Sequence, residues 1–300
     1  MLVATHGMKL PLRDIEGPDI QKVVAGGDML VAITAEHRIR HVASDPTLRL
    51  REQYWTRVVD AAISRFHEGM CVGLIEDGTC MLAKRALRSI TARNYNSQQA
   101  QNREFERVND TVKSWSDVIQ LAVSDAIFAL HKDGTVSCCE FSRPFTEPIY
   151  KRVQSWRDVQ KLVVGSQCSV VGITIDGTIL VDGFNLTRND EKIVNTCCHL
   201  DIADVILCGS ECERIFFLDK SGRICNSEGE AVYPGFYTDV LGNWDYTLLA
   251  RDAEHKLHVL DPGCFHIANE GECEAWGLVA SYAILNQGFS QGAVVAVCEK

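Results

Sequence analysis

One recurring pair of residues limits what this chain can fold into more than any other feature of its sequence. A large hydrophobic residue is followed three positions later by valine seven times along the chain. Self-similarity at a period of about 40 residues is the mark of a repeat architecture. The pattern predicts one repeat domain over residues 1–300. The seven pairs are Ile20/Val23, Trp55/Val58, Trp115/Val118, Trp156/Val159, Ile202/Val205, Tyr237/Val240 and Trp276/Val279, so the units start near residues 20, 55, 115, 156, 202, 237 and 276.

A turn between two apolar runs forms the second half of each unit. Asp-Gly in this setting favours a β-hairpin with a type I′ turn, in which both central residues have positive φ. The aspartates in these turns are expected to serve turn geometry rather than to bind a ligand. The clear turns are Asp77-Gly78, Asp133-Gly134, Asp176-Gly177 and Ser221-Gly222, and the weaker ones are Glu36-His37, Glu254-His255 and Gln291-Gly292.

Antiparallel units of this size cannot bury both faces alone, so they are expected to pack radially as the blades of a β-propeller. The sequence predicts an all-β fold of seven four-stranded blades with little helix. Leu2-Val-Ala-Thr5 reads as a separate strand that would complete the last blade and close the ring. Closure removes the exposed sheet edges that make all-β chains prone to aggregate. An aspartate just before the valine in four units (Asp117, Asp158, Asp204 and Asp239) is expected to fix how each unit enters its sheet.

The central units also resemble a known family. Trp156 through Gly165, followed by Val171 through Gly183, is similar to a repeat of the regulator of chromosome condensation family. Residues 55–82 and 115–138 resemble further copies, and Ile20, Ile202 and Tyr237 stand where the repeat expects tryptophan. The resemblance implies a seven-bladed propeller that serves as a binding platform. The eponymous member is a nucleotide-exchange factor for a small GTPase, and another relative of this fold inhibits an enzyme.

Composition narrows the class of partner. Forty acidic residues against thirty basic ones give a net charge of −10, which argues against a nucleic-acid partner because phosphate binding needs a basic surface. No stretch approaches the roughly 20 apolar residues of a membrane span. Thirteen cysteines in a chain that starts without a secretory signal are expected to be reduced, buried and small-hydrophobic in role. These features predict a cytoplasmic protein with no membrane partner.

No motif in the sequence indicates an enzyme or a cofactor. Gly288-Phe-Ser-Gln-Gly292 fits G-x-S-x-G, but a strand-like run follows it and no histidine comes later, so Ser290 is not expected to be a nucleophile. The densest set of soft metal ligands is Cys197, Cys198, His199, Cys208 and Cys212. Adjacent residues of a strand point to opposite faces, so buried cysteines are favoured here over a zinc site.

The polar segment from residue 84 to residue 113 is the most individual part of the chain. It holds seven basic and three acidic residues, a surplus of four positive charges on an otherwise acidic protein. Long insertions in compact folds are often functional, so this one is a candidate contact for an acidic partner protein; a solvated surface loop is the alternative. The candidate binding residues are Arg85, Arg88, Arg93, Arg103 and Arg107.

A shorter segment, Phe141 through Pro148, contains two prolines and two aromatic residues and offers a rigid contact point. Its candidate binding residues are Phe141, Arg143 and Phe145.

The function that these observations favour is a non-catalytic scaffold for protein–protein interaction, without a cofactor. One alternative is a regulator of a single enzyme, either an exchange factor for a small GTPase or an inhibitor. The other alternative is a propeller that binds a carbohydrate or small ligand through aromatic residues such as Phe265 and Tyr282.

Overall fold

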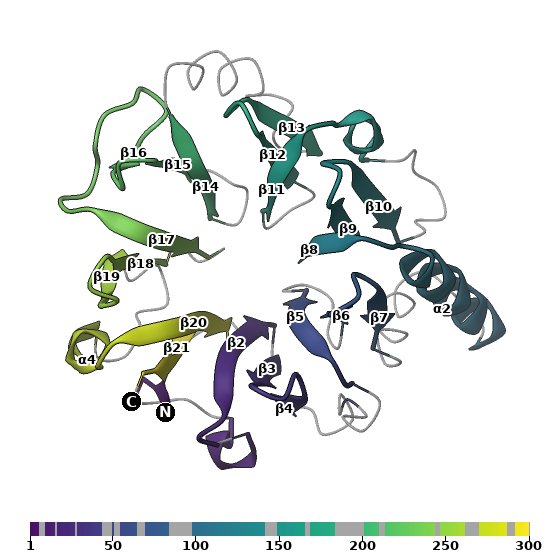
Figure 1. The fold of residues 1–300 in the computed structure, drawn as a ribbon, viewed down its shortest axis with the longest axis horizontal. Coiled ribbons are helices and arrows are strands. Elements are labelled where there is room, and N and C mark those ends of the chain that lie inside the picture. Colours follow the sequence, from purple (N-terminus) through teal and green to yellow (C-terminus); the bar gives the residue numbers. More distant parts are fainter. Residues whose placement is uncertain are drawn as a thin grey trace.

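The apolar runs between the turns form short antiparallel strands, and in the computed structural model these strands assemble into seven sheets arranged in a ring (Figure 1). The structure describes residues 1–5, 10–15, 17–27, 29–43, 50, 55–64, 70–83, 98–141, 149–165, 169–183, 201–209, 214–243, 247–261, 270–286 and 292–299. The predicted all-β propeller is therefore confirmed.

The strands follow one another in groups of three. Blades 1 to 4 consist of β2 (Ile20–Gly26), β3 (Met29–Thr34) and β4 (Ile39–Ala43); β5 (Val58–Ile63), β6 (Cys71–Ile75) and β7 (Cys80–Leu82); β8 (Val118–Val123), β9 (Ala126–His131) and β10 (Val136–Glu140); and β11 (Val159–Val164), β12 (Ser169–Thr174) and β13 (Ile179–Gly183). Blades 5 to 7 consist of β14 (Ile202–Cys208), β15 (Arg214–Asp219) and β16 (Ile224–Cys225); β17 (Tyr237–Gly242), β18 (Leu248–Asp252) and β19 (Leu257–Asp261); and β20 (Val279–Asn286), β21 (Gly292–Cys298) and β1 (Leu2–Ala4). The helices are η1 (Leu12–Asp14), α2 (Gln98–Lys113), η4 (Val153–Ser155) and α4 (Glu270–Ala275).

The first strand of each blade runs from the perimeter toward the centre of the ring, and the other two lie outside it (Figure 1). Within the described residues each sheet has three strands, where the sequence predicted four. After β4, β7, β10 and β13 the chain soon enters residues outside the described ranges. After β16 it is described, and there it adds only one bridge, between Cys225 and Ala231. Within the part of the chain that the structure describes, the predicted four strands per blade are therefore corrected to three.

The N-terminal strand closes the ring as predicted. Leu2 pairs with Val297 and Ala4 with Val295, so β1 is the outer strand of blade 7. The terminal ammonium donates to the carbonyl oxygen of Cys298 at 2.6 Å, and the amide of Thr5 donates to that of Val294 at 3.0 Å.

The hydrophobic core is divided among the seven blade–blade interfaces. Each cluster of buried side chains combines strands of one blade with the first strand of the next. Phe128 of β9, for example, packs against Val159 and Leu162 of β11. The cluster between blades 7 and 1 contains Leu285 and Ile20, so the closing interface is as apolar as the others.

A β-bulge at the second residue of every first strand sets which side chains reach these clusters. In β8, Val118 pairs with His131 and Gln120 pairs with Leu130, which leaves Ile119 without a partner. The extra residue makes the first and fourth residues of the strand, Val118 and Leu121, face the same cluster. The same register shift occurs in β2, β5, β11, β14, β17 and β20.

The bulge corrects the predicted alignment of three units. Ile20, Ile202 and Tyr237 pair at the start of their strands, where the other blades have valine, and so they do not replace tryptophan. A bulged strand buries its own first and fourth residues, which gives the same spacing as the tryptophan–valine pair. Tryptophan precedes the strand by three residues only in blades 2, 3, 4 and 7 (Trp55, Trp115, Trp156 and Trp276).

In blades 1 to 6 the turns between second and third strands are where the sequence placed them, but their type differs. The turn predicted at Gln291-Gly292 is misplaced, because Gly292 begins β21, the second strand of blade 7. Gly78 and Gly134 have φ of 77° and 79°, whereas Asp77 and Asp133 are not left-handed. Each is a three-residue turn with a left-handed third residue, so the type I′ prediction is wrong. In blades 1 and 6 a histidine takes the glycine position, with φ of 57° at His37 and 61° at His255.

A helix occupies the second half of the basic segment, where little helix was expected. Phe105, Val108 and Val112 of α2 pack into the cluster between blades 2 and 3, against β7 and β10. Their spacing of three and four residues was the available signal. No described helix is long and apolar enough to cross a membrane.

Candidate functional site

Backbone hydrogen bonds of one kind join neighbouring blades where the first strands begin. The amide of Val118 donates to the carbonyl oxygen of Gly78 at 3.0 Å, and the amide of Val159 donates to that of Gly134 at 3.0 Å. The amides of Val58, Tyr237 and Val279 donate to His37, Gly222 and His255 in the same way. We call the residues that precede the first strands, the bulge residues and these turns the entry ring.

The residue just before the first strand is held by its backbone in six of the seven blades, and in blades 1, 2 and 5 its side chain also forms an ion pair within the blade (Asp19–Arg40, Arg57–Glu76 and Asp201–Lys220). Its carbonyl oxygen accepts from the first residue of the following turn in its own blade, as Asp117 does from the amide of Lys132 at 2.8 Å. Asp117 and Asp158 have φ of 55° and 57°, a conformation that aspartate tolerates better than most residues. The expected role of these two aspartates in strand entry is therefore supported.

Asp204 and Asp239 do not share that role. Both lie at the third residue of a first strand, directly after the bulge. The residues at this position in the seven blades are polar, and we call them the polar ring. There Lys22 pairs with Asp60 at 2.7 Å and Lys161 with Asp204 at 2.5 Å, in each case across a blade boundary. The ring is completed by Gln120, which exchanges two hydrogen bonds with the backbone of Leu162 (2.8 and 2.9 Å), and by Ser281, which accepts from the amide of Val23 at 3.2 Å.

The boundary between blades 5 and 6 is the acidic part of this polar ring. Burial raises the pKa of Asp204, Lys161 opposes the rise, and the carboxylate of Asp239 adds to it. Tyr282, a candidate ligand-binding aromatic, is buried among blade 6 and 7 side chains rather than exposed. Burial and the nearby Asp239 raise the pKa of Tyr282 well above its usual range. Asp204, Asp239 and Tyr282 therefore pack at blade boundaries and do not form an open ligand site.

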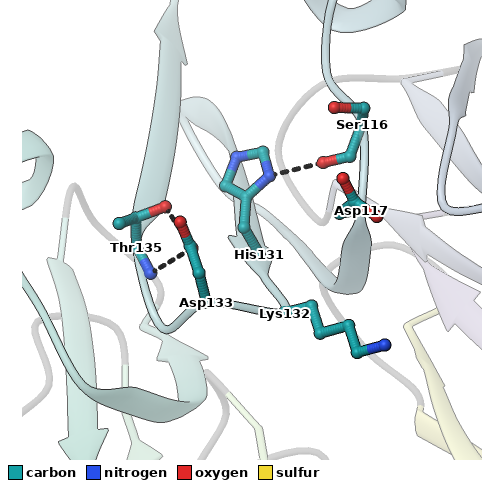
Figure 2. Close-up of a pocket in the computed structure, with 6 residues that line it drawn as sticks. All are labelled: Ser116, Asp117, His131, Lys132, Asp133 and Thr135. Atoms are coloured by element: carbon teal, nitrogen blue, oxygen red, sulfur yellow. Dashed lines mark hydrogen bonds between the residues drawn. The ribbon is translucent and has the colours of Figure 1, made fainter.

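A shallow groove of about 460 Å³ lies at the entry of blade 3 (Figure 2). His131 contacts the carbonyl oxygen of Ser116 through Nδ1 at 2.7 Å and the hydroxyl of Ser137 through Nε2 at 2.8 Å. A carbonyl oxygen only accepts, so the proton of the neutral imidazole is on Nδ1 and the hydroxyl donates to Nε2. The groove is lined by Ser116, Asp117, His131, Lys132, Asp133 and Thr135.

The remaining polar groups of the groove serve the turn. Asp133 accepts from the hydroxyl of Thr135 at 2.7 Å and from its amide at 3.0 Å, and these bonds lower the pKa of Asp133. Lys132 extends away from His131 and Asp133 (Figure 2). Neither Lys132 nor Asp117 forms an ion pair within the described part of the chain. The groove thus presents the ammonium group of Lys132 and the carboxylate of Asp117, neither of which is ion-paired with a described residue.

The equivalent place in blade 2 is occupied by charged side chains that pair with one another. Arg57 contacts Glu76 at 3.0 Å and Asp77 at 3.4 Å, and His37 of blade 1 also contacts Glu76. The bonds from Arg57 and then His37 lower the pKa of Glu76. The same backbone therefore carries an open groove in blade 3 and a closed ion-pair cluster in blade 2.

The candidate arginines of the basic segment fall into three groups. Arg107 is bound within the protein: it contacts both carboxylate oxygens of the buried Glu104 at 2.9 and 2.7 Å and the carbonyl oxygen of Glu140 at 2.7 Å. The bonds to Glu104 raise the pKa of Arg107. Arg103 is exposed on the outer face of α2. Arg85, Arg88 and Arg93 lie outside the described residues.

The contrast in charge within this segment belongs to its first part. Residues 98–113 carry three basic and three acidic residues, so the four surplus positive charges are in residues 84–97, outside the described ranges. Of the second candidate contact, Phe141 is 7% exposed and buried with α2 between blades 2 and 3, which corrects its interpretation as a surface contact. Arg143 and Phe145 lie outside the described residues.

The soft metal ligands noted in the sequence are not assembled in the described structure. Cys208 is buried in the cluster between blades 5 and 6, while Cys197, Cys198, His199 and Cys212 lie outside the described ranges, as do Ser290 and Phe265. Within those ranges no group of three or more His, Cys, Asp or Glu side chains is arranged to hold a metal ion.

Sequence reasoning missed the apolar side chains that the entry ring exposes. Ile119 and Val59, both bulge residues, are 51% and 38% exposed, and Ile175 in the turn of blade 4 is 68% exposed. Phe236 and Leu278, which directly precede β17 and β20, are 65% and 48% exposed. Only the bulge register shows that Ile119 and Val59 are unpaired, and the sequence pattern does not mark a bulge.

Comparison with known proteins gives a likeness in fold. No protein-family model matches the chain, and no curated protein matches it by sequence. Prp20p from Saccharomyces cerevisiae has a TM-score of 0.56 at 10% identity, over 91% of this chain and 81% of that one. Yeast RCC1 (Prp20) bound to Kap60 has a TM-score of 0.55 at 11% identity, over 93% and 80% of the two chains. The chain is a β-propeller similar in structure to RCC1.

Proposed function

We propose that this chain is a non-catalytic platform for protein–protein interaction and that its partner contacts the entry ring. One observation carries the proposal: the carbonyl oxygen at the position before the first strand accepts the same turn hydrogen bond in six blades, while the side chain at this position changes character around the ring. It is charged in blades 1 to 5 and apolar in blades 6 and 7 (Asp19, Arg57, Asp117, Asp158, Asp201, Phe236 and Leu278). Asp19, Arg57 and Asp201 pair within their own blades, whereas the entry side chains of blades 3, 4, 6 and 7 form no ion pair with a described residue and are the ones that recognition can use.

The non-catalytic part of the proposal is supported by how the titratable groups of the ring are used. His131, Glu76 and Asp133 each have partners that hold a turn or a blade boundary. An active site usually requires a base or nucleophile directed at an open pocket. The Ser137–His131 pair is instead oriented by the backbone carbonyl of Ser116, which precedes the first strand of blade 3.

A protein is the class of partner that the charge favours. The net charge of −10 opposes phosphate-rich partners, and the ring exposes apolar side chains of the kind that anchor protein interfaces. We place the chain in the cytoplasm, because the eight described cysteines are free thiols and burial raises the pKa of Cys71 and Cys80 to about 12, which keeps them unreactive.

The likeness to Prp20p supplies no partner by itself. Prp20p is known for its binding to Gsp1p and histones. At 10% identity the likeness extends to the fold, and folds of this kind carry many functions. A role as exchange factor or enzyme inhibitor is therefore not proposed here.

Site-specific photocrosslinking in cells tests the proposal. A photoreactive residue is placed at Ile119 in the entry ring, at Arg103 on α2, and at Arg13, whose side chain is 86% exposed in η1 and which serves as the control. The platform predicts a discrete protein adduct from Ile119 that is absent from Arg13. An adduct from Arg103 alone would place the contact on the insertion. Substrate turnover that ring substitutions abolish would contradict the non-catalytic role.

A further inference from the structure

An ordered apolar ledge projects from the outer edge of blade 5 where the chain passes to blade 6. It consists of residues 230–236, and Val232 and Phe236 within it are 38% and 65% exposed. Large apolar side chains that remain exposed in an ordered segment commonly mark an interaction site.

The ledge is held to the blade by its backbone and by one ring contact. The amide of Val232 donates to the carbonyl oxygen of Ile224 at 2.9 Å, and the hydroxyl of Tyr237 donates to that of Pro234 at 2.5 Å. Tyr233 turns inward onto Phe216, with ring centroids 5.8 Å apart. The exposed side chains are therefore presented on a fixed support, and binding need not pay the ordering entropy of a loose loop.

The charge along the ledge and its flanks has one sign, and the nearby cations Arg214, Lys220 and Arg223 are each paired with an aspartate of the protein. Residues 224–239 contain Glu228, Glu230 and Asp239 and no lysine or arginine. Glu230 accepts a hydrogen bond from the side-chain amide of Asn226 at 3.1 Å, and neither Glu228 nor Glu230 forms an ion pair with any described residue. An apolar surface flanked by unneutralised carboxylates favours a partner whose apolar side chains are flanked by lysine or arginine.

We propose that the ledge docks a segment of a partner protein that presents an apolar stripe with basic residues beside it. This inference rests on the proposed function and specifies one of its contacts. A nucleic acid or an anionic lipid surface is disfavoured by the carboxylates. A second copy of this chain is disfavoured for the same reason, because it would bring equal charges together.

Fluorescence anisotropy with synthetic peptides of about 18 residues, roughly five helical turns, tests the chemistry directly. The probe is an amphipathic peptide of leucine and lysine. One comparison peptide replaces every leucine by serine and keeps the charge, and the other replaces every lysine by glutamate. The leucine–lysine peptide is expected to bind at least tenfold more tightly than either. Equal binding of the serine–lysine peptide would reduce the effect to charge alone and overturn the proposal.

Matched variants locate the binding. Val232→Ser with Phe236→Ser is expected to weaken binding of the leucine–lysine peptide at least tenfold. Ile175→Ser, which removes a comparably exposed apolar side chain in blade 4, and Phe236→Leu are expected to retain it. Thermal unfolding of each variant checks that the fold is intact. Equal loss in Ile175→Ser would contradict the assignment to the ledge.

Charge reversal supplies an independent measurement. Glu228→Lys with Glu230→Lys is expected to weaken binding, whereas Glu36→Lys with Glu106→Lys, the same change in net charge at exposed sites elsewhere, is expected to leave most of it. Equal loss in both pairs overturns the local role of the carboxylates. An Ile119 crosslink combined with ledge variants that bind normally would leave the platform standing and remove this inference. A ledge effect without a crosslink from Ile119 would keep this inference and move the contact on the entry ring from blade 3 to Phe236, which belongs to both surfaces.

Discussion

The boundary between blades 3 and 4 and the boundary between blades 5 and 6 share one interblade backbone hydrogen bond and present different surfaces. In the first, the carbonyl oxygen of Gly134 accepts from Val159, and the entry residue is Asp158; in the second, Gly222 accepts from Tyr237 at 2.7 Å, and the entry residue is the exposed Phe236. The hydrogen bond between blades forms whether the entry residue is an aspartate or a phenylalanine. Stability therefore depends on the repeated backbone hydrogen bond, and the side chain of the entry residue is free to serve recognition.

The largest effect is expected from opening the ring, which every boundary shares. Deleting residues 1–5 removes the third strand of blade 7 and exposes the edge of β21, so we expect the free energy of unfolding to fall by about 5 kcal/mol or more, comparable with the whole stability of many domains. Chemical denaturation measures it. Leu2→Ala, which keeps the strand, is expected to cost about 2–3 kcal/mol. A deletion no more costly than Leu2→Ala would mean that β1 does not close the ring.

Two glycines sharpen the comparison of boundaries. A Cβ added at Gly134 would meet the Cα of Asp158 at 2.9 Å, whereas one added at Gly177 has no described atom within 4 Å, and φ is positive at both. Gly134→Ala is expected to destabilise by about 3 kcal/mol and Gly177→Ala by about 1 kcal/mol, the cost of the left-handed backbone alone. Equal losses in urea denaturation would show that the boundary contact at Gly134 contributes little.

The insertion helix offers a smaller test on two of its arginines. Arg107→Ala leaves the buried Glu104 without its partner and is expected to cost about 1–2 kcal/mol, because Arg107 itself is partly solvated. Arg103→Ala is expected to change the free energy of unfolding by less than about 0.5 kcal/mol. Thermal unfolding of the two variants measures the difference. A destabilising Arg103→Ala would contradict the orientation of α2.

Two aspartates of blade 5, both 6% exposed, are expected to respond to pH with opposite sign. Burial raises the pKa of Asp204, so its folded form holds the proton more tightly, and stability falls as pH rises from its ordinary value through the raised one. Burial acts on Asp219 too, but bonds from Ser221 and Arg223 outweigh it and lower the pKa of Asp219, so its contribution is lost as pH falls through that lowered value.

The corresponding asparagine variants separate these signs. Relative to the parent chain, Asp204→Asn should gain stability as pH rises from about 3 to 7, and Asp219→Asn should lose stability over the same range. Urea denaturation at several pH values from about 3 to 7 measures both differences. Parallel curves for the two variants would contradict the assignment.

The sequence predicted the ring, the turns of blades 1 to 6 and the closing strand, because glycine at a left-handed turn and alternating apolar runs are local signals. It misaligned the blades that start at Ile20, Ile202 and Tyr237, since a bulged strand imitates the tryptophan–valine spacing. The bulge also hid the candidate site: Ile119 reads as a buried strand residue until the pairing shows it to be unpaired. The prediction that Phe141 is a surface contact was wrong, because the sequence did not reveal that α2 covers this side chain.

The affinity of the protein crosslinked at Ile119 tests the central claim most directly. That partner protein should be titrated against the parent chain, Ile119→Asp in the entry ring and Arg103→Asp on α2. Both side chains are exposed, so unchanged stability of the two variants is expected and should be checked. The platform predicts at least tenfold weaker binding, about 1.4 kcal/mol, for Ile119→Asp and unchanged binding for Arg103→Asp. Unchanged binding by Ile119→Asp with a loss in Arg103→Asp would move the contact to the insertion and contradict the role of the entry ring.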